Sequence, residues 1–249
     1  SADGSVLRDA KALCDLCGGW NLIPLGIGVE RVAEEIARAL PEASIVRFDG
    51  DTVKTKAAAL RAAAHFSEPG TIIVGTESLL HWLDPTATIS LGIVSADTLL
   101  ALPFWRARER FVRLALSLAE HTEHLLVATR RPDDAACTAL ASRGAASFFK
   151  EETTLRALFH YPPFGHLLII RIKGEKNLDA DEALLRAALA PRGVARLPDR
   201  QTTTGYQAST VRTLVIKIAR EEWPSSELAA MLVALPHYIS VSVDSESLW

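Results

Sequence analysis

The chain has 249 residues, of which 49% are hydrophobic and 23% charged, and its formal net charge is −3. This composition supplies apolar material for one core of ordinary size and a second, smaller one, while a near-neutral charge argues against nonspecific wrapping of long nucleic-acid tracts. Because the sequence shows neither a run of 18 apolar residues nor an export signal, we expect a cytoplasmic protein without a membrane partner.

The first feature along the chain is a cysteine pair, Cys14 and Cys17, followed by Gly18. The C-x-x-C spacing is that of half a zinc knuckle, and a structural zinc site needs four such ligands. The third cysteine, Cys137, falls in a predicted helix far along the chain, and three cysteines do not make a disulfide framework. Two interpretations stay open: a half site for zinc, or a pair of reduced thiols.

Short β-branched and apolar runs alternate with helical patterns in the first half of the chain. The runs predict strands at 22–25, 44–47, 71–74, 89–94 and 125–128. Apolar residues at i, i+3, i+4 and i+7 predict helices from Val29 to Leu40 and from Phe104 to Leu118. This alternation indicates a parallel sheet covered by helices, which binds ligands at the carboxyl ends of its strands.

The pattern changes after Thr129. Helices are predicted at 135–141 and 151–159, and Tyr161-Pro162-Pro163 then forces an extended break. The break predicts a domain boundary just before it, so an α/β domain is followed by a smaller α+β domain. The smaller domain is expected to have strands at 167–172, 194–197, 211–218 and 239–243, with helices at 180–189 and 225–235. This βαββαβ order is the split βαβ, or ferredoxin-like, arrangement.

A polar segment of the smaller domain, Gln201 to Thr210, is predicted to be a flexible loop and a candidate DNA contact. Arginines could hold phosphates there while one aromatic ring stacks on a base. The alternative is a solvated hairpin connection whose arginines only keep it soluble. The candidate DNA-binding residues are Arg192, Arg196, Arg200, Tyr206 and Arg212.

Five motifs occur in an order and spacing similar to those of one helicase family. They are Gly26-x-Gly28 after the cysteine pair, Arg47-x-Asp49-x-Asp51-Thr52, Gly75-Thr76, the run from Asp97 to Arg110, and Tyr161 to Phe164. With these motifs the chain resembles the C-terminal part of the bacterial primosomal replication-restart helicases (primosomal protein N′, PriA). The resemblance implies a remnant of a zinc-binding segment at 1–20, a RecA-like second helicase lobe at 21–153, and a C-terminal α+β domain at 154–249.

The charged positions of the motor motifs depart from the family pattern. Glu77 and Ser78 replace the Gln and Met of G-T-Q-M, and His121 and His124 replace both arginines of Q-V-x-G-R-A-G-R. Histidine is mostly neutral at physiological pH and lacks the guanidinium fork, and an arginine finger accounts for roughly 10³ to 10⁵ in rate. We therefore expect no catalytic residues and no ATP as cofactor. The degenerate nucleotide-binding positions are Gly75, Thr76, Glu77, Glu120, His121 and His124.

These observations predict a DNA-binding replication-restart protein without ATPase or helicase activity of its own. Two alternatives are the C-terminal part of an active ATP-dependent 3′–5′ DNA helicase and a protein-interaction module without DNA affinity. The resemblance implies forked or single-stranded DNA, single-stranded DNA-binding protein and other primosome proteins as partners, with zinc as the candidate cofactor.

Overall fold

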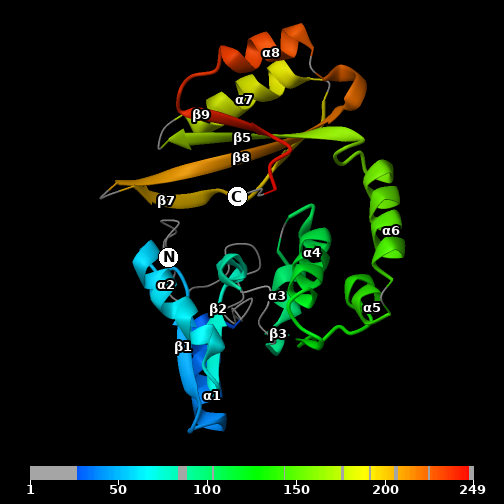
Figure 1. Cartoon of the computed structure of the whole chain (residues 1–249). Coiled ribbons are helices and arrows are strands. Elements are labelled where there is room, and N and C mark those ends of the chain that lie inside the picture. Colours follow the sequence, from blue (N-terminus) through cyan, green and yellow to red (C-terminus); the bar gives the residue numbers. More distant parts are fainter. Residues whose placement is uncertain are drawn as a thin grey trace. The chain divides into compact units, whose positions relative to one another are not determined.

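The computed structural model describes residues 27–83, 89–102, 104–142, 144–174, 177–190, 192–204, 207–223 and 225–246. Their contacts divide them into two compact units (Figure 1). The lobe unit contains 27–102 and 107–148, and the C-terminal unit contains 104–106 and 149–246. The short segment 104–106 thus belongs to the C-terminal unit, although the chain on both sides of it belongs to the lobe unit. Within the described ranges, no helix combines the length and apolar character needed to cross a membrane.

The strands of the lobe unit are parallel, as the alternating pattern predicts. β1 (Ser44–Phe48) pairs with β2 (Thr71–Gly75), and β3 (Leu91–Ile93) pairs with β4 (Leu125–Val127). The predicted single sheet is realised as two separate two-stranded sheets among these four strands. The strand expected at 22–25 lies outside the described residues.

Amphipathic helices supply the core of the lobe unit. The apolar stripe of the first predicted helix is confirmed, because Val32 and Ala33 are buried against Val74 of β2. The longest helix of this unit buries Phe111, Val112 and Ala115. The helical elements are α1 (Val29–Ala39), α2 (Lys56–Ala64), η1 (His65–Ser67), η2 (Glu77–Trp82), α3 (Ala96–Leu100), α4 (Ala107–Ala119) and α5 (Ala135–Ala141).

The C-terminal unit has the predicted βαββαβ order with one additional strand between the second and third predicted strands, so the observed order is βαβββαβ. Helix α6 (Ala145–Leu158) leads into it, and its strands form one antiparallel sheet in the order β6-β8-β5-β9, with β7 also paired to β8. Its elements are β5 (Gly165–Gly174), α7 (Leu178–Leu189), β6 (Val194–Arg196), β7 (Arg200–Thr204), β8 (Gln207–Ala219), η3 (Arg220–Glu222), α8 (Ser226–Val233) and β9 (Ile239–Val243).

Helices α7 and α8 pack on one face of this sheet (Figure 1). Alternate residues of the two central strands point to that face, as the two-residue period of a strand requires. They form the largest apolar cluster described, and its buried members are Leu168, Ile170, Ile172, Leu185, Leu189, Leu214, Ile216, Ile218 and Leu228.

The prediction of a flexible loop from Gln201 to Thr210 is wrong. Residues 201–204 and 207–210 lie instead in the paired strands β7 and β8, whose register runs from Arg200–Val211 to Thr204–Gln207. Polar composition favours loops, but the threonines of β7 are β-branched and suit a strand once a partner strand is present. The candidate arginines therefore lie on and beside strands rather than on a flexible segment.

Candidate functional site

The Gly75–Glu77 turn, at the carboxyl end of β2, lies tightly against β1. A Cβ atom on Gly75 would lie 2.5 Å from the carbonyl oxygen of Phe48 and 2.8 Å from Cδ1 of Leu79. The next amide, that of Thr76, donates to the same Phe48 oxygen at 3.2 Å. The backbones approach so closely that only glycine fits without displacement. Backbone packing alone thus explains why the motif has glycine at position 75, without reference to any ligand.

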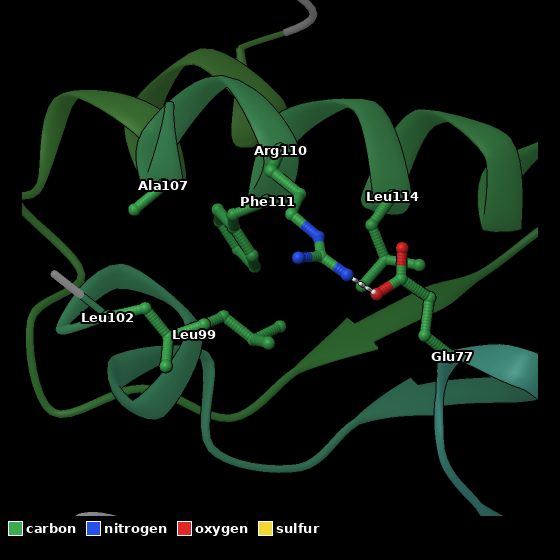
Figure 2. Close-up of a pocket in the computed structure, with 7 residues that line it drawn as sticks. All are labelled: Glu77, Leu99, Leu102, Ala107, Arg110, Phe111 and Leu114. Carbon is green, nitrogen blue, oxygen red and sulfur yellow. Dashed lines mark hydrogen bonds and ion pairs between the residues drawn. The ribbon is translucent and has the colours of Figure 1, made fainter. Parts of the chain in front are cut away.

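Glu77, the acidic residue of this turn, forms an ion pair with Arg110 of α4 (Figure 2). Its Oε2 atom lies 2.6 Å from Nη2 of Arg110, and both side chains are 43% exposed. Figure 2 shows this pair beside a small apolar pocket between α3 and α4, lined by Leu99, Leu102, Ala107, Phe111 and Leu114. The enclosed volume of about 10 Å³ is close to what one water molecule needs, so the pocket has no room for a nucleotide.

The ion pair changes the electrostatics expected from the sequence. Without a partner, the carboxylate of Glu77 would add negative charge where triphosphate would arrive. Its charge is instead balanced by the Arg110 guanidinium, so repulsion from Glu77 is weaker than expected. The same ion pair also means that the guanidinium of Arg110, an arginine of the motif run, already contacts a carboxylate.

The second predicted segment, Glu120 to His124, lies beyond the end of α4. The hydroxyl of Thr122 donates to the carbonyl oxygen of His124 and accepts its amide, which holds the segment in a turn. Glu120, Glu123 and His124 are exposed, whereas His121 is half-buried. Arg110 and Ala119, the last residue of α4, are separated along the helix by roughly 14 Å at 1.5 Å per residue. The Glu77 ion pair and the two histidines therefore lie near opposite ends of one helix.

Asp49, at the carboxyl end of β1, has a structural role. Its Oδ1 atom accepts the amides of Asp51 and Thr52, and its Oδ2 atom accepts two guanidinium nitrogens of Arg47 at 2.9 and 3.1 Å. Burial acts to raise the pKa of Asp49, but the hydrogen bonds from Thr52 and Arg47 outweigh it and hold this pKa below its usual value. The carboxylate therefore caps a turn; the N-cap of α2 is Thr55.

Asp97 joins the carboxyl ends of β3 and β4. Its carboxylate accepts the backbone amide of Arg130 at 2.9 Å and the hydroxyl of Thr129 at 3.1 Å. The amide of Arg130, which is the largest cause, and the Thr129 hydroxyl lower the pKa of Asp97. The motif identified Asp97 in the sequence but not its two partners, because they follow a different strand.

Arg212, a predicted DNA contact, is buried in an ion-pair network. Its guanidinium contacts the carboxylates of Asp179, Glu182 and Asp199, and its side chain is only 7% exposed. The hydrogen bond from Arg212 is the largest cause that lowers the pKa of Asp199, and the same bond is the largest that raises the pKa of Arg212. The Arg212 guanidinium is thus already surrounded by anions and is not placed to meet a phosphate.

The other candidate DNA contacts lie in varied surroundings. Arg196 contacts Asp199 at 3.0 Å, and Arg192 contacts Glu222 at 2.8 Å. Arg200 lies near Arg171, whose pKa is lowered mainly by burial and further by the charge of Arg200. Tyr206 lies outside the described residues.

The predicted zinc ligands, Cys14 and Cys17, also lie outside the described residues. Among the residues that are described, no group of three or more His, Cys, Asp or Glu side chains could hold a metal ion. Cys137 is a half-buried free thiol, and burial is the main cause that raises its pKa.

Comparison with known proteins gives one consistent result. The chain is 26% identical to the replication restart protein PriA of Bacillus subtilis over 84% of its length, and 25% identical to that of Synechocystis over 94%. It is 33% identical over 70% of its length to the probable replication restart protein PriA of Deinococcus radiodurans. The chain spans 29%, 28% and 18% of these three relatives, which is less than a third of each. No family model matches the chain.

Proposed function

Because this chain is a relative of the C-terminal part of the replication restart protein PriA, we propose that it is a DNA-binding replication-restart module that does not hydrolyse ATP by itself. The proposed ligands are forked and single-stranded DNA, and the proposed protein partners are single-stranded DNA-binding protein and other primosome proteins. The proposed location is the cytoplasm, and zinc at Cys14 and Cys17 stays a prediction.

The observation that carries the proposal is the ion pair between Glu77 and Arg110. In the resembled motor motifs, an arginine beside the G-T-Q-M turn could meet phosphate, but here a carboxylate lies 2.6 Å from it. The second arginine motif is replaced by two histidines, each of which directly follows an exposed acidic residue, Glu120 or Glu123. The 249 residues also contain no G-x-x-x-x-G-K-[ST] loop to hold the phosphates. Together these features support the absence of ATP turnover by this chain.

We expect this chain to release no phosphate from ATP, with or without forked DNA. The double variant His121→Arg/His124→Arg should also stay inactive, because restoring two cations does not supply the missing phosphate loop. The measurement is phosphate release at several protein concentrations. A rate of phosphate release that rises in proportion to the concentration of wild-type protein, and that stays with the protein through successive purification steps, would contradict the proposal.

Fluorescence anisotropy across a salt series should detect binding of forked and single-stranded oligonucleotides. Since each lost phosphate contact lowers the salt slope by about 0.7 to 0.9, Arg200→Ala should weaken binding and reduce the slope by about 1. Arg31→Ala is the matched control, because Arg31 is an exposed arginine of the lobe unit with a local partner, Glu35. Affinity at low salt that is the same for both variants and wild type would remove Arg200 from the DNA contact.

One observation favours a second candidate, the C-terminal part of an active ATP-dependent helicase. Arg110 balances Glu77, so this turn is less repulsive to phosphate than its sequence indicates. The chain also spans less than a third of each relative, so the rest of such a motor would lie outside these 249 residues. Fork unwinding with ATP after adding the N-terminal portion of a PriA relative would select this candidate. Absence of any DNA binding would instead select a protein-interaction module.

A further inference from the structure

The turn between α6 and β5 displays apolar side chains to solvent. Phe159 is 52% exposed and Phe164 is 36% exposed, and Leu158 beside them is 68% exposed. Exposed single apolar residues are ordinary, but two aromatic rings within one short turn are a larger feature. This turn contains the Tyr161–Phe164 motif, to which the proposed function assigns no role.

The backbone of the turn is held at both ends. The amide of Tyr161 donates to the carbonyl oxygen of Arg156, and the amide of Phe164 donates to that of Tyr161, each at 2.9 Å. His160 adopts a positive φ of 51°, and a Cβ on Gly165 would lie 2.8 Å from the His160 carbonyl oxygen. The turn therefore has little freedom to rearrange. Rings presented by a fixed backbone bind a partner with less loss of conformational entropy.

A half-buried aromatic pair supports the turn from within the C-terminal unit. The ring of Tyr161 stacks on that of Trp105, with centroids 6.0 Å apart and planes 7° apart. The guanidinium of Arg156 lies 4.9 Å from the Trp105 centroid. Tyr161 and Trp105 thus already have ring and cation partners, whereas Phe159 and Phe164 present their rings to solvent.

Positive charge lies next to the exposed rings. The amine of Lys217 donates to the Phe159 carbonyl oxygen at 2.9 Å and lies 4.0 Å from the Tyr161 centroid. Lys217 and Arg220 are both exposed at the end of β8. Of the neighbouring acids, Glu222 contacts Arg192 and Glu152 contacts Arg156. Aromatic rings beside cations are complementary to bases joined by phosphates, and less so to a purely apolar protein surface.

We propose that Phe159 and Phe164 form a stacking platform for the bases of single-stranded nucleic acid, and that Lys217 contacts the adjoining phosphate. This inference rests on the proposed DNA-binding function and assigns it a surface other than the candidate arginines of the sequence analysis. Stacking on a ring tolerates any base, because every base has a π-face. The platform therefore binds single strands without sequence preference.

The test uses the full chain and a fluorescein-labelled 20-mer of thymidylate, with an abasic 20-mer as the backbone-only probe. Phe159→Leu and Phe164→Leu keep apolar volume but remove the ring, and each is expected to weaken thymidylate binding about tenfold. Phe159→Tyr and Phe164→Tyr keep an aromatic ring and should bind thymidylate like wild type. Lys217→Gln should reduce the salt slope by about 1. Leu158→Ala is the matched control and should bind like wild type.

Three outcomes overturn the inference in distinguishable ways. If wild type binds thymidylate and the two leucine variants bind equally well, the platform is excluded while DNA binding stands. If wild type binds the abasic probe as tightly as thymidylate, or if Leu158→Ala loses as much as the ring variants, the contact is not stacking. If wild type binds neither probe, the proposed DNA-binding function fails and the platform fails with it. Unchanged far-UV circular dichroism checks that each variant is folded.

Discussion

Replacing Arg212 by methionine is expected to lower the free energy of unfolding of the C-terminal unit by about 3 kcal/mol at pH 7. The substitution leaves Glu182 and Asp199, whose side chains are only 11% and 25% exposed, without their buried cation, so that the more exposed Arg196 is the cation that still contacts both. Hydrogen exchange of the β5 and β8 amides measures this change, because it reports on the sheet of this unit alone.

The acid dependence of that loss has a definite sign. Arg212 holds the pKa of Asp199 below its unfolded value, so the pair contributes stability above the unfolded carboxyl pKa of about 3.9. The contribution is lost as pH falls through the folded pKa, and the difference between wild type and variant should therefore shrink below about pH 4. Arg192→Met, which removes a more exposed pair with Glu222, is the control and should change stability by less than about 1 kcal/mol. Equal effects of the two variants would contradict a structural role for Arg212.

Gly75→Ala is expected to destabilise the lobe unit by about 2 kcal/mol, although it adds a single methyl group. That methyl would lie 2.5 Å from the Phe48 carbonyl oxygen, so β1 and β2 must separate or the turn must shift. Gly92→Ala is the matched control, since Gly92 also lies in a parallel strand but its nearest neighbour would be 3.8 Å away.

Thermal unfolding of both glycine variants compares these effects. Gly92→Ala should be neutral or slightly stabilising, because alanine has less conformational freedom than glycine in the unfolded chain. If Gly75→Ala were as stable as Gly92→Ala, the close approach of the two strands would not constrain the motif. In that case a ligand-related reason for Gly75 would become the better explanation.

Local patterns in the sequence predicted most elements of the fold. The limits of α5 and β9 are as predicted, because a short apolar repeat and a β-branched run each carry their own signal. Strand pairing could not be predicted in this way, since β1 contacts β2 and β3 contacts β4 through residues far apart in the chain. The Thr202–Thr204 segment was misassigned because its polar composition favours a loop, while its pairing with β8 depends on tertiary structure.

The candidate site was located from sequence but its contacts were not. The motif identified Glu77, yet its partner Arg110 lies 33 residues away on α4. Arg212 was interpreted as a phosphate contact because arginines cluster near it in the sequence. Its carboxylate partners Asp179 and Glu182 come from α7, which only the folded sheet brings beside β8. Charge counted along the chain therefore overestimated the cations available to DNA.

The membership of residues 104–106 in the C-terminal unit limits how the protein can be dissected. A fragment beginning at Phe149 would lack Trp105, so Tyr161 would lose its stacked neighbour and the carbonyl oxygen of Ser245 would lose its indole donor. Such a truncation would uncover apolar surface that the intact polypeptide buries, and poor solubility of the fragment would then reflect the position of the cut. A fragment that keeps the native packing must therefore include Trp105, for example as an added peptide that contains residues 104–106.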